Sequence, residues 1–378
     1  MIKRIKVLHV IRSLHKAGAE KICIDICESL NNRAEVDVLL VSLSEENSFK
    51  SKTEKLPFKI INSKVFPSIT GKKIVDINEF EKIIAEFKPD VVHSHLFWSE
   101  LLVKEKTHQN IKYVTHCHDN IQEFKKFGFS TLLTKKSITK FYERLYIIRK
   151  LKKCDNHFIA ISEDTKSYFN KVLPKSIRKV KLLHNAINTA DYKMNTSKKE
   201  LEKLVLINIG RFAKYKNQQF LVDVAFKLKE RGYPIELHFL GEGPEFENVK
   251  YKTKTLKLQS EVFFHGNVDF VQTFLWDSFI YVHSANYEPF GLVLLEAMSA
   301  GLPVISVNGK GNQDLIVNDK NGYLLGEDVE LFSNKIIKLW ENKKKYNAMS
   351  KYAINYADKF DIKNYTDTLV EFYYSILK

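Results

Sequence analysis

The stretch Glu288-Pro-Phe-Gly-Leu-Val-Leu-Leu-Glu296 decides how the second half of this chain folds. The apolar run before it, residues 279–282, predicts a short buried strand. Pro289 suits the first position of a helix, where its missing N–H loses no hydrogen bond, and Gly301-Leu302-Pro303 supplies a stop for that helix. The sequence therefore predicts a strand, a polar turn and then a helix that begins at Pro289.

The start of this predicted helix is suited to binding an anion. The first N–H groups of a helix have no intrahelical partner, and the absence of a side chain at Gly291 lets an anion approach closely. We expect the N–H groups of Phe290, Gly291 and Leu292 to face it. Glu288 and Glu296 are eight residues apart, just over two helical turns, so both carboxylates are expected on nearly the same face. The alternative is an ordinary amphipathic helix with two surface glutamates.

The composition indicates a folded protein of two domains. The chain has 378 residues, of which 44% are hydrophobic, and this suffices for packed cores. Its cysteines, Cys23, Cys27, Cys117 and Cys154, include no C-x-x-C pair, so reduced thiols are expected. No cleavage site of a signal peptide is visible, and no apolar run is long enough to span a bilayer. These features predict a cytoplasmic protein.

The net charge of +15 permits two partners, nucleic acid or an anionic membrane. Only eight of the sixty basic residues are arginine. Proteins that read nucleic acid rely on arginine for its forked contacts, so the charge by itself gives little support to nucleic-acid binding.

Strands and helices alternate along both halves of the chain, which predicts parallel sheets. In the first half we expect strands at 6–11, 36–43, 90–95, 113–118, 158–162 and 180–184, with helices at 21–30 and 79–87. In the second half we expect strands at 204–209, 235–240, 262–265, 279–283 and 303–306, with helices at 217–229, 245–258, 289–300 and 331–343. The fold class is therefore α/β with two doubly wound, Rossmann-like domains, whose ligands bind beyond the carboxyl ends of the strands.

A polar, lysine-rich segment at 189–203 is the expected linker between these domains. The predicted domains are 1–190 and 204–360. Within the C-terminal stretch 362–378 we expect an amphipathic helix over residues 362–377, which packs back onto the first domain.

Two cations follow the first strand of the second domain. Arg211 comes directly after Gly210 at the strand end, and Lys216 follows five residues later. Opposite a helix N-terminus, they would form a clamp for a diphosphate, arginine through a forked contact and lysine as a point charge. The alternative is a solvated basic turn. No two aspartates stand two residues apart, so the D-x-D pair that often holds Mg²⁺ on a nucleotide is absent, and we expect neither a metal nor another cofactor.

Histidines gather at two predicted strand ends in the first domain. His93, His95, His116, Cys117 and His118 would converge there, which raises the hypothesis of a zinc site. Their spacings match no common zinc pattern, so the preferred interpretation is a set of polar residues at strand ends. His118, followed by Asp119, lies where a bound substrate would meet this domain.

With these sites, the chain resembles the GT-B glycosyltransferases of the retaining family 4, a group that includes transferases for capsular polysaccharide, lipopolysaccharide and glycolipids. The resemblance extends over essentially the whole chain. The segments that carry it are Ala17-Gly18-Ala19-Glu20, Thr115-x-x-His118-Asp119, Ala160-Ile-Ser162-Glu163, Asn185-Ala-Ile-Asn188, Gly210-Arg211 with Lys216, Gly241-x-Gly243-Pro244, Phe264-x-Gly266 and Glu288 to Glu296. It implies a GT-B fold in which an acceptor-side first domain and a donor-binding second domain face a central cleft.

The resemblance also implies roles for the candidate residues. The implied catalytic residues are Glu288 and His118, which contact the transferred sugar, and Arg211 and Lys216, which hold the diphosphate. The implied donor-binding residues are Gly18, Arg211, Lys216, Asn267, Val268, Phe290, Gly291, Leu292 and Glu296. Among these, Glu296 holds the ribose hydroxyls, the backbone near Asn267 and Val268 reads the base, and Gly18 lets the first loop approach the phosphates.

Two segments depart from the pattern of the family that the chain resembles. The first loop usually has two glycines, and here the first position is Ala17. The segment Gly309-Lys-Gly-Asn-Gln-Asp314 replaces the commoner glycine-glycine-x-x-glutamate form. The second departure is consistent with a subgroup that has its own sugar preference.

The predicted function is that of a retaining hexosyltransferase in capsule or lipopolysaccharide biosynthesis. Its donor is a nucleotide-diphosphate sugar. UDP-linked sugars are the most frequent donors of similar proteins and GDP-mannose is the next, so we expect a UDP-sugar. The acceptor is a saccharide or a lipid-linked saccharide. One alternative is a nucleotide-sugar epimerase on the same fold, since a fold does not fix a function. A second is a basic nucleic-acid-binding protein, although no nucleic-acid motif is recognisable.

A basic stretch predicts peripheral attachment to the inner face of the cytoplasmic membrane. Residues 125–153 contain ten basic residues and one acidic residue, Glu143. Apolar residues recur there at helical spacing, flanked by basic residues, as in a helix that lies on an anionic lipid surface. The apolar residues are Ile138, Phe141, Leu145, Ile148 and Leu151, and the basic ones are Lys136, Lys140, Arg144 and Lys152. The alternative is a helix packed on the first domain with solvated lysines.

Overall fold

The computed structural model describes residues 4–67, 74–126, 134–193 and 201–378. The chain divides into two compact units, one made of residues 1–185 with 362–378, the other of residues 186–361. We call them unit 1 and unit 2. The division falls near residue 186, a few residues before the predicted linker, whose central part, 194–200, lies outside the described residues.

The sheet of unit 1 has seven parallel strands in the order β3-β2-β1-β6-β7-β8-β9. They are β1 (Ile5–Ile11), β2 (Val36–Ser42), β3 (Phe58–Ile60), β6 (Val91–His95), β7 (Lys112–Cys117), β8 (Asn156–Ala160) and β9 (Val180–Leu182), and a separate antiparallel pair is formed by β4 (Lys64–Phe66) and β5 (Ile74–Asp76). The helices are α1 (Gly18–Asn31), α2 (Lys50–Thr53), α3 (Asn78–Phe87), α4 (Phe97–Val103), α5 (Lys135–Leu151), α6 (Glu163–Val172) and α13 (Ile362–Leu377).

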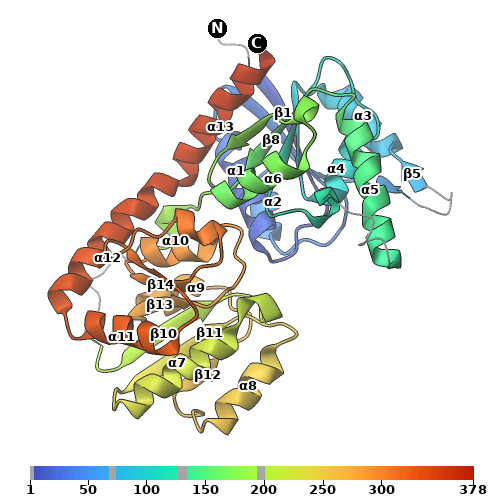
Figure 1. The fold of residues 1–378 in the computed structure, drawn as a ribbon. Coiled ribbons are helices and arrows are strands. Elements are labelled where there is room, and N and C mark those ends of the chain that lie inside the picture. Colours follow the sequence, from blue (N-terminus) through green and yellow to red (C-terminus); the bar gives the residue numbers. More distant parts are fainter. Residues whose placement is uncertain (1–3, 68–73, 127–133, 194–200) are drawn as a thin grey trace. The chain divides into compact units, whose positions relative to one another are not determined.

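The two faces of this sheet are covered by different helices. Leu8 and Val10 of β1 belong to a core completed by apolar residues of α3, α4, α5 and α6. His9, which alternates with them, points to the opposite face. There α13 packs beside α1, with a hydrogen bond of 2.8 Å between the hydroxyls of Ser29 and Thr366 (Figure 1). The C-terminal helix is therefore part of unit 1.

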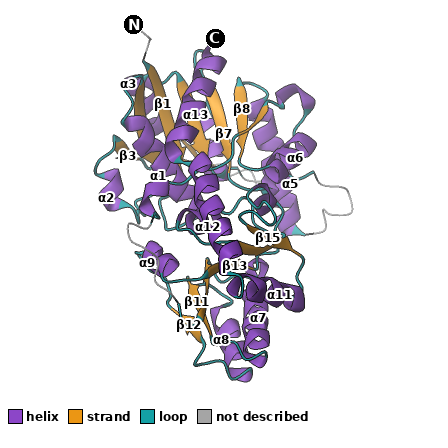
Figure 2. Cartoon of the chain, turned by 90° about the vertical axis from the view of Figure 1, so that its left-hand side faces the viewer, coloured by secondary structure: helices purple, strands orange, loops and turns teal. Residues whose placement is uncertain are grey.

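The sheet of unit 2 has six parallel strands in the order β12-β11-β10-β13-β14-β15, with helices packed around it (Figure 2). The strands are β10 (Leu204–Ile209), β11 (Ile235–Leu240), β12 (Val262–Phe264), β13 (Ile280–His283), β14 (Val304–Val307) and β15 (Gly322–Leu325). The helices are α7 (Gln218–Glu230), α8 (Phe246–Thr255), α9 (Val271–Trp276), α10 (Leu292–Ser299), α11 (Val329–Trp340) and α12 (Lys343–Ala357). Strand β15 and helix α12 lie in segments for which the sequence predicted no element.

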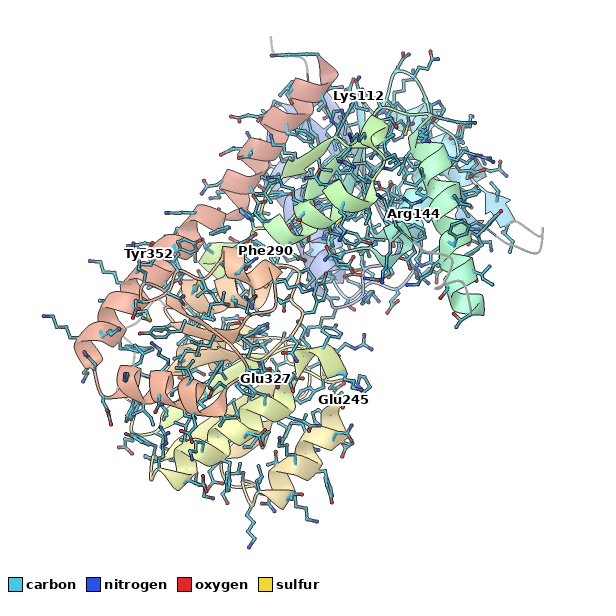
Figure 3. The ribbon with its side chains drawn as sticks, in the orientation of Figure 1. Lys112, Arg144, Glu245, Phe290, Glu327 and Tyr352 are labelled. Atoms are coloured by element: carbon cyan, nitrogen blue, oxygen red, sulfur yellow. The ribbon has the colours of Figure 1, made fainter. Side chains whose placement is uncertain are left out.

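Helix α5 departs from the predicted lipid-facing pattern. Ile148 and Leu151, which were expected on the lipid face, are buried in the core of unit 1, whereas Ile138 and Leu145 are exposed. Arg144 (Figure 3) was expected to flank that face, but it donates hydrogen bonds of 3.1 Å to the backbone carbonyls of Phe124 and Val172. The C-terminal half of α5 is thus a packing element.

None of the helices in the described ranges is both long enough and apolar enough to cross a membrane.

Candidate active site

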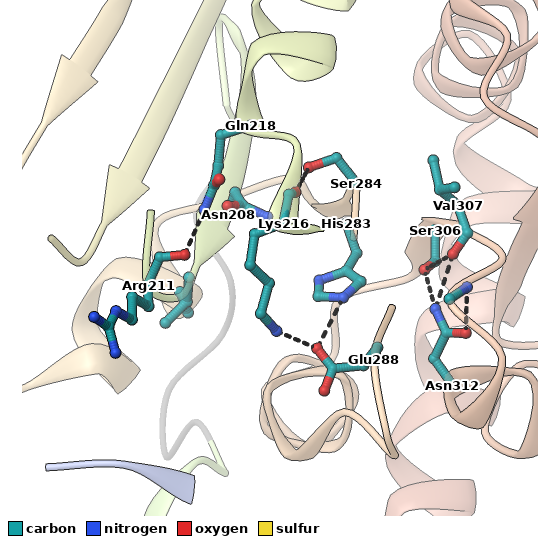
Figure 4. A network of polar contacts seen from close by, with 12 residues as sticks. Asn208, Arg211, Lys216, Gln218, His283, Ser284, Glu288, Ser306, Val307 and Asn312 are labelled. Atoms are coloured by element: carbon teal, nitrogen blue, oxygen red, sulfur yellow. Dashed lines mark hydrogen bonds and ion pairs between the residues drawn. The ribbon is translucent and has the colours of Figure 1, made fainter. Parts of the chain in front are cut away.

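An ion pair lies at the carboxyl-terminal edge of the sheet in unit 2 (Figure 4). Nζ of Lys216, in the turn between β10 and α7, is 2.5 Å from Oε2 of Glu288, which follows β13. Nε2 of His283, the last residue of β13, lies 3.1 Å from the same carboxylate oxygen. The fold thus brings Lys216 and Glu288 into contact across 72 residues of chain.

The charges of this group are fixed by its surroundings. Burial by itself would raise the pKa of Glu288, but the Lys216 ammonium and the His283 ring outweigh burial and lower that pKa to about 2. Burial lowers the pKa of His283, so its ring is neutral near pH 7. The site therefore presents an ionised carboxylate held between an ammonium and a neutral imidazole.

The backbone of Glu288 is held by the loop that follows β14. The Glu288 N–H donates to the carbonyl of Gly309 (2.8 Å), and the Glu288 carbonyl accepts from the N–H of Gly311 (3.0 Å). A Cβ on Gly311 would lie 1.9 Å from the carbonyl oxygen of Pro289, so only glycine permits this approach. Buried Asn312 ties the loop together through hydrogen bonds of 2.8 Å to Ser306, Val307 and Gly309. The segment that departs from the family pattern therefore supports Glu288 directly.

The predicted helix start is wrong by three residues. Helix α10 begins at Leu292, because Gly291 adopts a left-handed conformation (φ 102°) and ends the preceding loop. Phe290 and Gly291 precede the helix, and the Phe290 side chain is buried. Of the three residues predicted to offer N–H groups from the helix, only Leu292 belongs to it.

Arg211 is separate from the Lys216–Glu288 pair. Its side chain is exposed and, in Figure 4, extends away from that pair, while its carbonyl accepts a hydrogen bond of 3.1 Å from Nε2 of Gln218. The adjacent loop packs backbone to backbone, since a Cβ on Gly241 would lie 2.3 Å from the Gly210 carbonyl oxygen. Arg211 can therefore contact a bound ligand only from the solvent-exposed rim of the carboxyl-terminal edge of this sheet.

The remaining predicted residues of unit 2 lie beside the same edge. Asn267 and Val268 follow β12, and the exposed Asn267 donates a hydrogen bond of 3.1 Å to the carboxylate of Glu242. Glu296 is a buried residue of α10. Asn267 and Val268 thus lie in a loop beyond the carboxyl end of a parallel strand, the usual location of ligands in such folds, whereas Glu296 lies one turn inside the helix that follows β13.

Unit 1 has a hollow of about 640 Å³ at the carboxyl ends of its own strands. His118 lines it, together with Arg12, Trp98, Asp119 and Lys140. The guanidinium of Arg12 lies 5.3 Å from the centre of a Trp98 ring. Low-dielectric surroundings, with a contribution from Glu123, raise the pKa of Asp119 to about 6. The hollow thus combines an aromatic surface with charges of both signs.

Gly18 occupies a different position from the one predicted. It is the exposed first residue of α1, not part of a loop that continues to Glu20. Ala17, the departure in the first loop, is the N-terminal cap of that helix in an extended conformation (φ −148°), which any residue can adopt. The extra methyl group therefore strains nothing here.

Among the described residues of unit 1, three sets of buried side chains bring potential metal ligands within 4.8 Å of one another. They are His9 with His93 and His95, His9 with Cys23 and Cys27, and His95 with His116 and His118. The histidines of both predicted strand ends do converge, as the zinc hypothesis required.

Several residues of these sites were not predicted. His283 contacts the Glu288 carboxylate, Lys310 is bridged to Glu288 through the backbone, and Asn312 holds the loop that bonds Glu288. Arg12 and Trp98 line the hollow of unit 1. His283 could have been recognised, since it is the last residue of the predicted strand 279–283, just as His118 is the last residue of the predicted strand 113–118. The others are recognisable only from contacts between segments distant in the chain.

Comparison with known proteins identifies both halves of the chain. Residues 17–191 match the family described as Glycosyltransferase Family 4, and residues 191–356 match Glycosyl transferases group 1. Poly(glycerol-phosphate) alpha-glucosyltransferase of Bacillus subtilis (strain 168) is 30% identical over 169 residues, which is 44% of this chain and only 25% of that protein. The capsular polysaccharide biosynthesis glycosyltransferase CapH of Staphylococcus aureus is 26% identical over 98% of this chain and 99% of its own length.

A solved structure shows the same fold. HepE of Anabaena, crystallised in complex with UDP-glucose, superimposes with a TM-score of 0.78 at 18% sequence identity, covering 98% of this chain and all of that one. The predicted α/β class, with parallel sheets in two Rossmann-like domains of GT-B type, is therefore confirmed.

Proposed function

Because the chain belongs to the glycosyltransferases, with a Family 4 domain followed by a group 1 domain, we propose that it is a retaining hexosyltransferase of surface polysaccharide biosynthesis. It moves a sugar from a nucleotide diphosphate to a saccharide or lipid-linked saccharide. The observation that carries this proposal is the contact between Lys216 and Glu288 at the carboxyl edge of the parallel sheet in unit 2. The full-length relative CapH, a capsular transferase, supports the proposed biosynthetic role.

Lys216 and Glu288 stabilise charges of opposite sign that develop on the donor as it reacts. As the C1–O bond to the diphosphate breaks, negative charge develops on the phosphate oxygen and positive charge on the sugar ring. Lys216, with Arg211 from the rim, stabilises the departing diphosphate. Glu288 is ionised at neutral pH and stabilises the oxocarbenium-like ring. Lys216 and His283 orient this carboxylate before the reaction, so no reorganisation is required at the transition state.

Transfer then needs an acceptor hydroxyl and a base. The hydroxyl oxygen forms the new bond to C1 on the face that the diphosphate leaves, and its proton passes to the departing phosphate oxygen. In this proposal the acceptor occupies the hollow of unit 1, where Trp98 offers a surface for a sugar ring, and His118 contacts the transferred sugar.

The donor nucleotide can be identified by thermal stabilisation. We expect UDP, at about 100 times its Kd, to stabilise the protein by about 2.7 kcal/mol and to raise the unfolding midpoint by roughly 5–10 °C. Glu296→Ala should shrink this shift, since we assign Glu296 to the ribose hydroxyls. EDTA should leave the shift and the transfer activity unchanged, because no metal is invoked in holding the diphosphate.

Each arm of this experiment has a contradicting outcome. A larger shift with GDP would make the donor a GDP-sugar. Loss of activity in EDTA, restored by Mg²⁺ or Mn²⁺, would mean that a metal stabilises the leaving group. No shift with any nucleoside diphosphate would contradict the proposed function.

We also propose that unit 1 attaches reversibly to an anionic membrane through the side of α5 that exposes Ile138 and Leu145. Ile138 and Leu145 are 42% and 49% exposed, and a separation of seven residues, two helical turns, puts them on one side of the helix. Basic residues surround them in the sequence. Each lysine or arginine near an anionic surface contributes on the order of 1 kcal/mol, so a few of them suffice for reversible binding.

Sedimentation with vesicles tests this attachment. The double variant Ile138→Glu/Leu145→Glu should bind vesicles of phosphatidylglycerol about ten-fold or more weakly than the wild type at low salt, because it loses apolar contact and adds negative charge. Leu331→Glu, at an exposed leucine of α11 in unit 2, is the matched control and should bind normally. Equal sedimentation of both variants, or no wild-type binding, would leave α5 as a packing helix alone.

A further inference from the structure

Lys310 has a strained backbone in the loop that holds Glu288. Its φ of 77° and ψ of −77° are those of the rare, strained form of the γ-turn, and the Gly311 N–H closes this turn through a contact of 3.2 Å to the Gly309 carbonyl. Residues with a side chain seldom adopt such a φ, whereas glycine adopts it freely. Lysine is therefore an unfavourable residue for this backbone conformation.

The hydrogen bonds that Lys310 makes with the described residues come from its backbone. Its N–H donates to Oδ1 of Asn308 (3.0 Å), and its carbonyl accepts from the N–H of Gln313 (3.3 Å). A glycine would make both bonds without strain. The Lys310 side chain is exposed, and its ammonium pairs with no carboxylate among the described residues. The loop by itself thus gives no reason for a lysine.

Strained backbone conformations of this kind cluster at ligand-binding and active sites. Lys310 lies at such a place, because it is bridged to Glu288, with the backbone hydrogen bonds of Gly309 and Gly311 on either side of the bridge. The lysine side chain is a flexible four-carbon stem that ends in a compact charge. Its ammonium can therefore reach a group that is bound at Glu288.

The loop of Lys310 and the two cations assigned to the diphosphate approach Glu288 from different sides. In Figure 4, Lys216 and Arg211 lie on one side of the Glu288 carboxylate, and Asn312, from the loop that contains Lys310, lies on the other. In the proposed function the diphosphate lies with Lys216 and Arg211, and the sugar lies at Glu288. We therefore expect the sugar, and not the diphosphate, to be within reach of Lys310.

A cation beside the transferred sugar has an electrostatic consequence. Glu288 stabilises the positive charge that develops on the ring, and an unpaired ammonium nearby would oppose this stabilisation. An anionic substituent on the sugar would neutralise the ammonium and accept a charge-assisted hydrogen bond from it. A neutral hexose offers no such partner.

We propose that Lys310 is a specificity-determining residue that pairs with a carboxylate on the transferred sugar, so that the preferred donor is a nucleotide-linked uronic acid. This inference rests on the proposed function, in which Glu288 faces the sugar and Lys216 the diphosphate. It names the class of sugar that the site selects, and it explains why a strained lysine stands where glycine would be more stable.

Matched pairs of donors that differ only at C6 test the proposal. For UDP they are UDP-glucuronate with UDP-glucose and UDP-galacturonate with UDP-galactose, and for GDP the pair is GDP-mannuronate with GDP-mannose. In at least one pair the wild type should bind the acid about ten-fold or more tightly, measured as Kd by calorimetry. Lys310→Met should remove this preference and leave the Kd of the nucleoside diphosphate unchanged, whereas Lys310→Arg should keep most of the preference.

The matched control is Lys257→Met. Lys257 follows α8 and is another exposed lysine of unit 2 with a positive φ (53°). It is outside the loops that hold Glu288, so its replacement should leave the preference for the acid as it is in the wild type.

A second measurement tests the strain without any ligand. Lys310→Gly should raise the unfolding midpoint by roughly 2–4 °C, because glycine adopts this φ freely. Lys310→Ala should not raise it, because alanine keeps the strain. Both variants should lose the preference for the acid, since both lack the ammonium.

Three outcomes would overturn the proposal. They are equal affinity for the acid and the neutral sugar in every pair, a loss of affinity for the nucleoside diphosphate in Lys310→Met as large as that for the acid, and a Lys310→Gly variant no more stable than the wild type. The second would place Lys310 at the diphosphate. If no nucleoside diphosphate bound at all, the proposed function itself would fail, whereas nucleotide binding without a preference for an acid would refute the role of Lys310 alone.

Discussion

Replacing Glu288 with alanine is expected to lower the rate of sugar transfer by on the order of 10²–10³-fold. The carboxylate is the group that we assign to the sugar ring, and it is already ionised and oriented in the protein alone. Glu288 is mostly buried but lies at the sheet edge, outside the apolar core, so the variant should still fold. The measurement is the initial rate with saturating donor, alongside circular dichroism to confirm folding.

Lys216→Ala should cause a loss of similar size, and the double variant should be scarcely worse than either single one. The two residues share a contact of 2.5 Å, so removing either disturbs the other, and the effects of such residues are not additive. The control is Lys227→Ala with Glu330→Ala, an exposed ion pair of 2.7 Å in the same unit. Wild-type turnover in Glu288→Ala, or fully additive losses in the pair, would contradict the assignment.

The lowered pKa of Glu288 predicts how the stability of the protein depends on pH. Because this pKa is lowered to about 2 in the folded protein, the carboxylate contributes stability that is present above its unfolded pKa and is lost as pH falls toward 2. Glu288→Gln should therefore be less stable than the wild type near pH 7, with the difference shrinking below about pH 4.5. If the rate of transfer falls at acid pH, protonation of Glu288 should not be the cause, because its pKa is about 2.

The sequence allowed the sheets and the chemistry to be predicted, because both depend on local pattern. Strands at 204–209 and 235–240 and the helix at 362–377 agree with the structure to the residue, since short runs rich in apolar residues and regular amphipathic spacing specify them. The carboxyl ends of parallel strands necessarily share one edge, which is why Lys216 and Glu288 could be placed together.

What could not be predicted depends on contacts between distant segments. Pro289 looked like a helix start, but the backbone hydrogen bonds of Glu288 with Gly309 and Gly311 hold the chain in a non-helical loop until Gly291. Nothing near 288 in the sequence encodes that pairing. The convergence of the histidines was predicted, but the hydrogen bond between His93 and Tyr373 was not, because Tyr373 comes from the far end of the chain.

Replacing Lys104 with methionine should cause a large loss of stability, because Lys104 is the partner of a buried carboxylate. Lys104 and Glu100 form an ion pair at the end of α4, with Nζ 3.5 Å from Oε2 and side-chain exposures of 0% and 1%. The Glu100 carboxylate also accepts from the hydroxyl of Ser94, which lies between His93 and His95 on β6. The pair therefore lies behind β6, the strand that carries His93 and His95.

Lys104→Met would leave a buried carboxylate without its partner, which typically costs about 3–5 kcal/mol, so the unfolding midpoint should fall by roughly 6–20 °C. Adding Glu100→Gln should recover most of this loss, because the amide still accepts from Ser94 and no charge remains to be solvated. Lys106→Met, at a lysine whose side chain is 58% exposed, should change stability by no more than about 0.5 kcal/mol. A double variant as unstable as Lys104→Met alone would show that lost packing, and not the unpaired charge, is the cause.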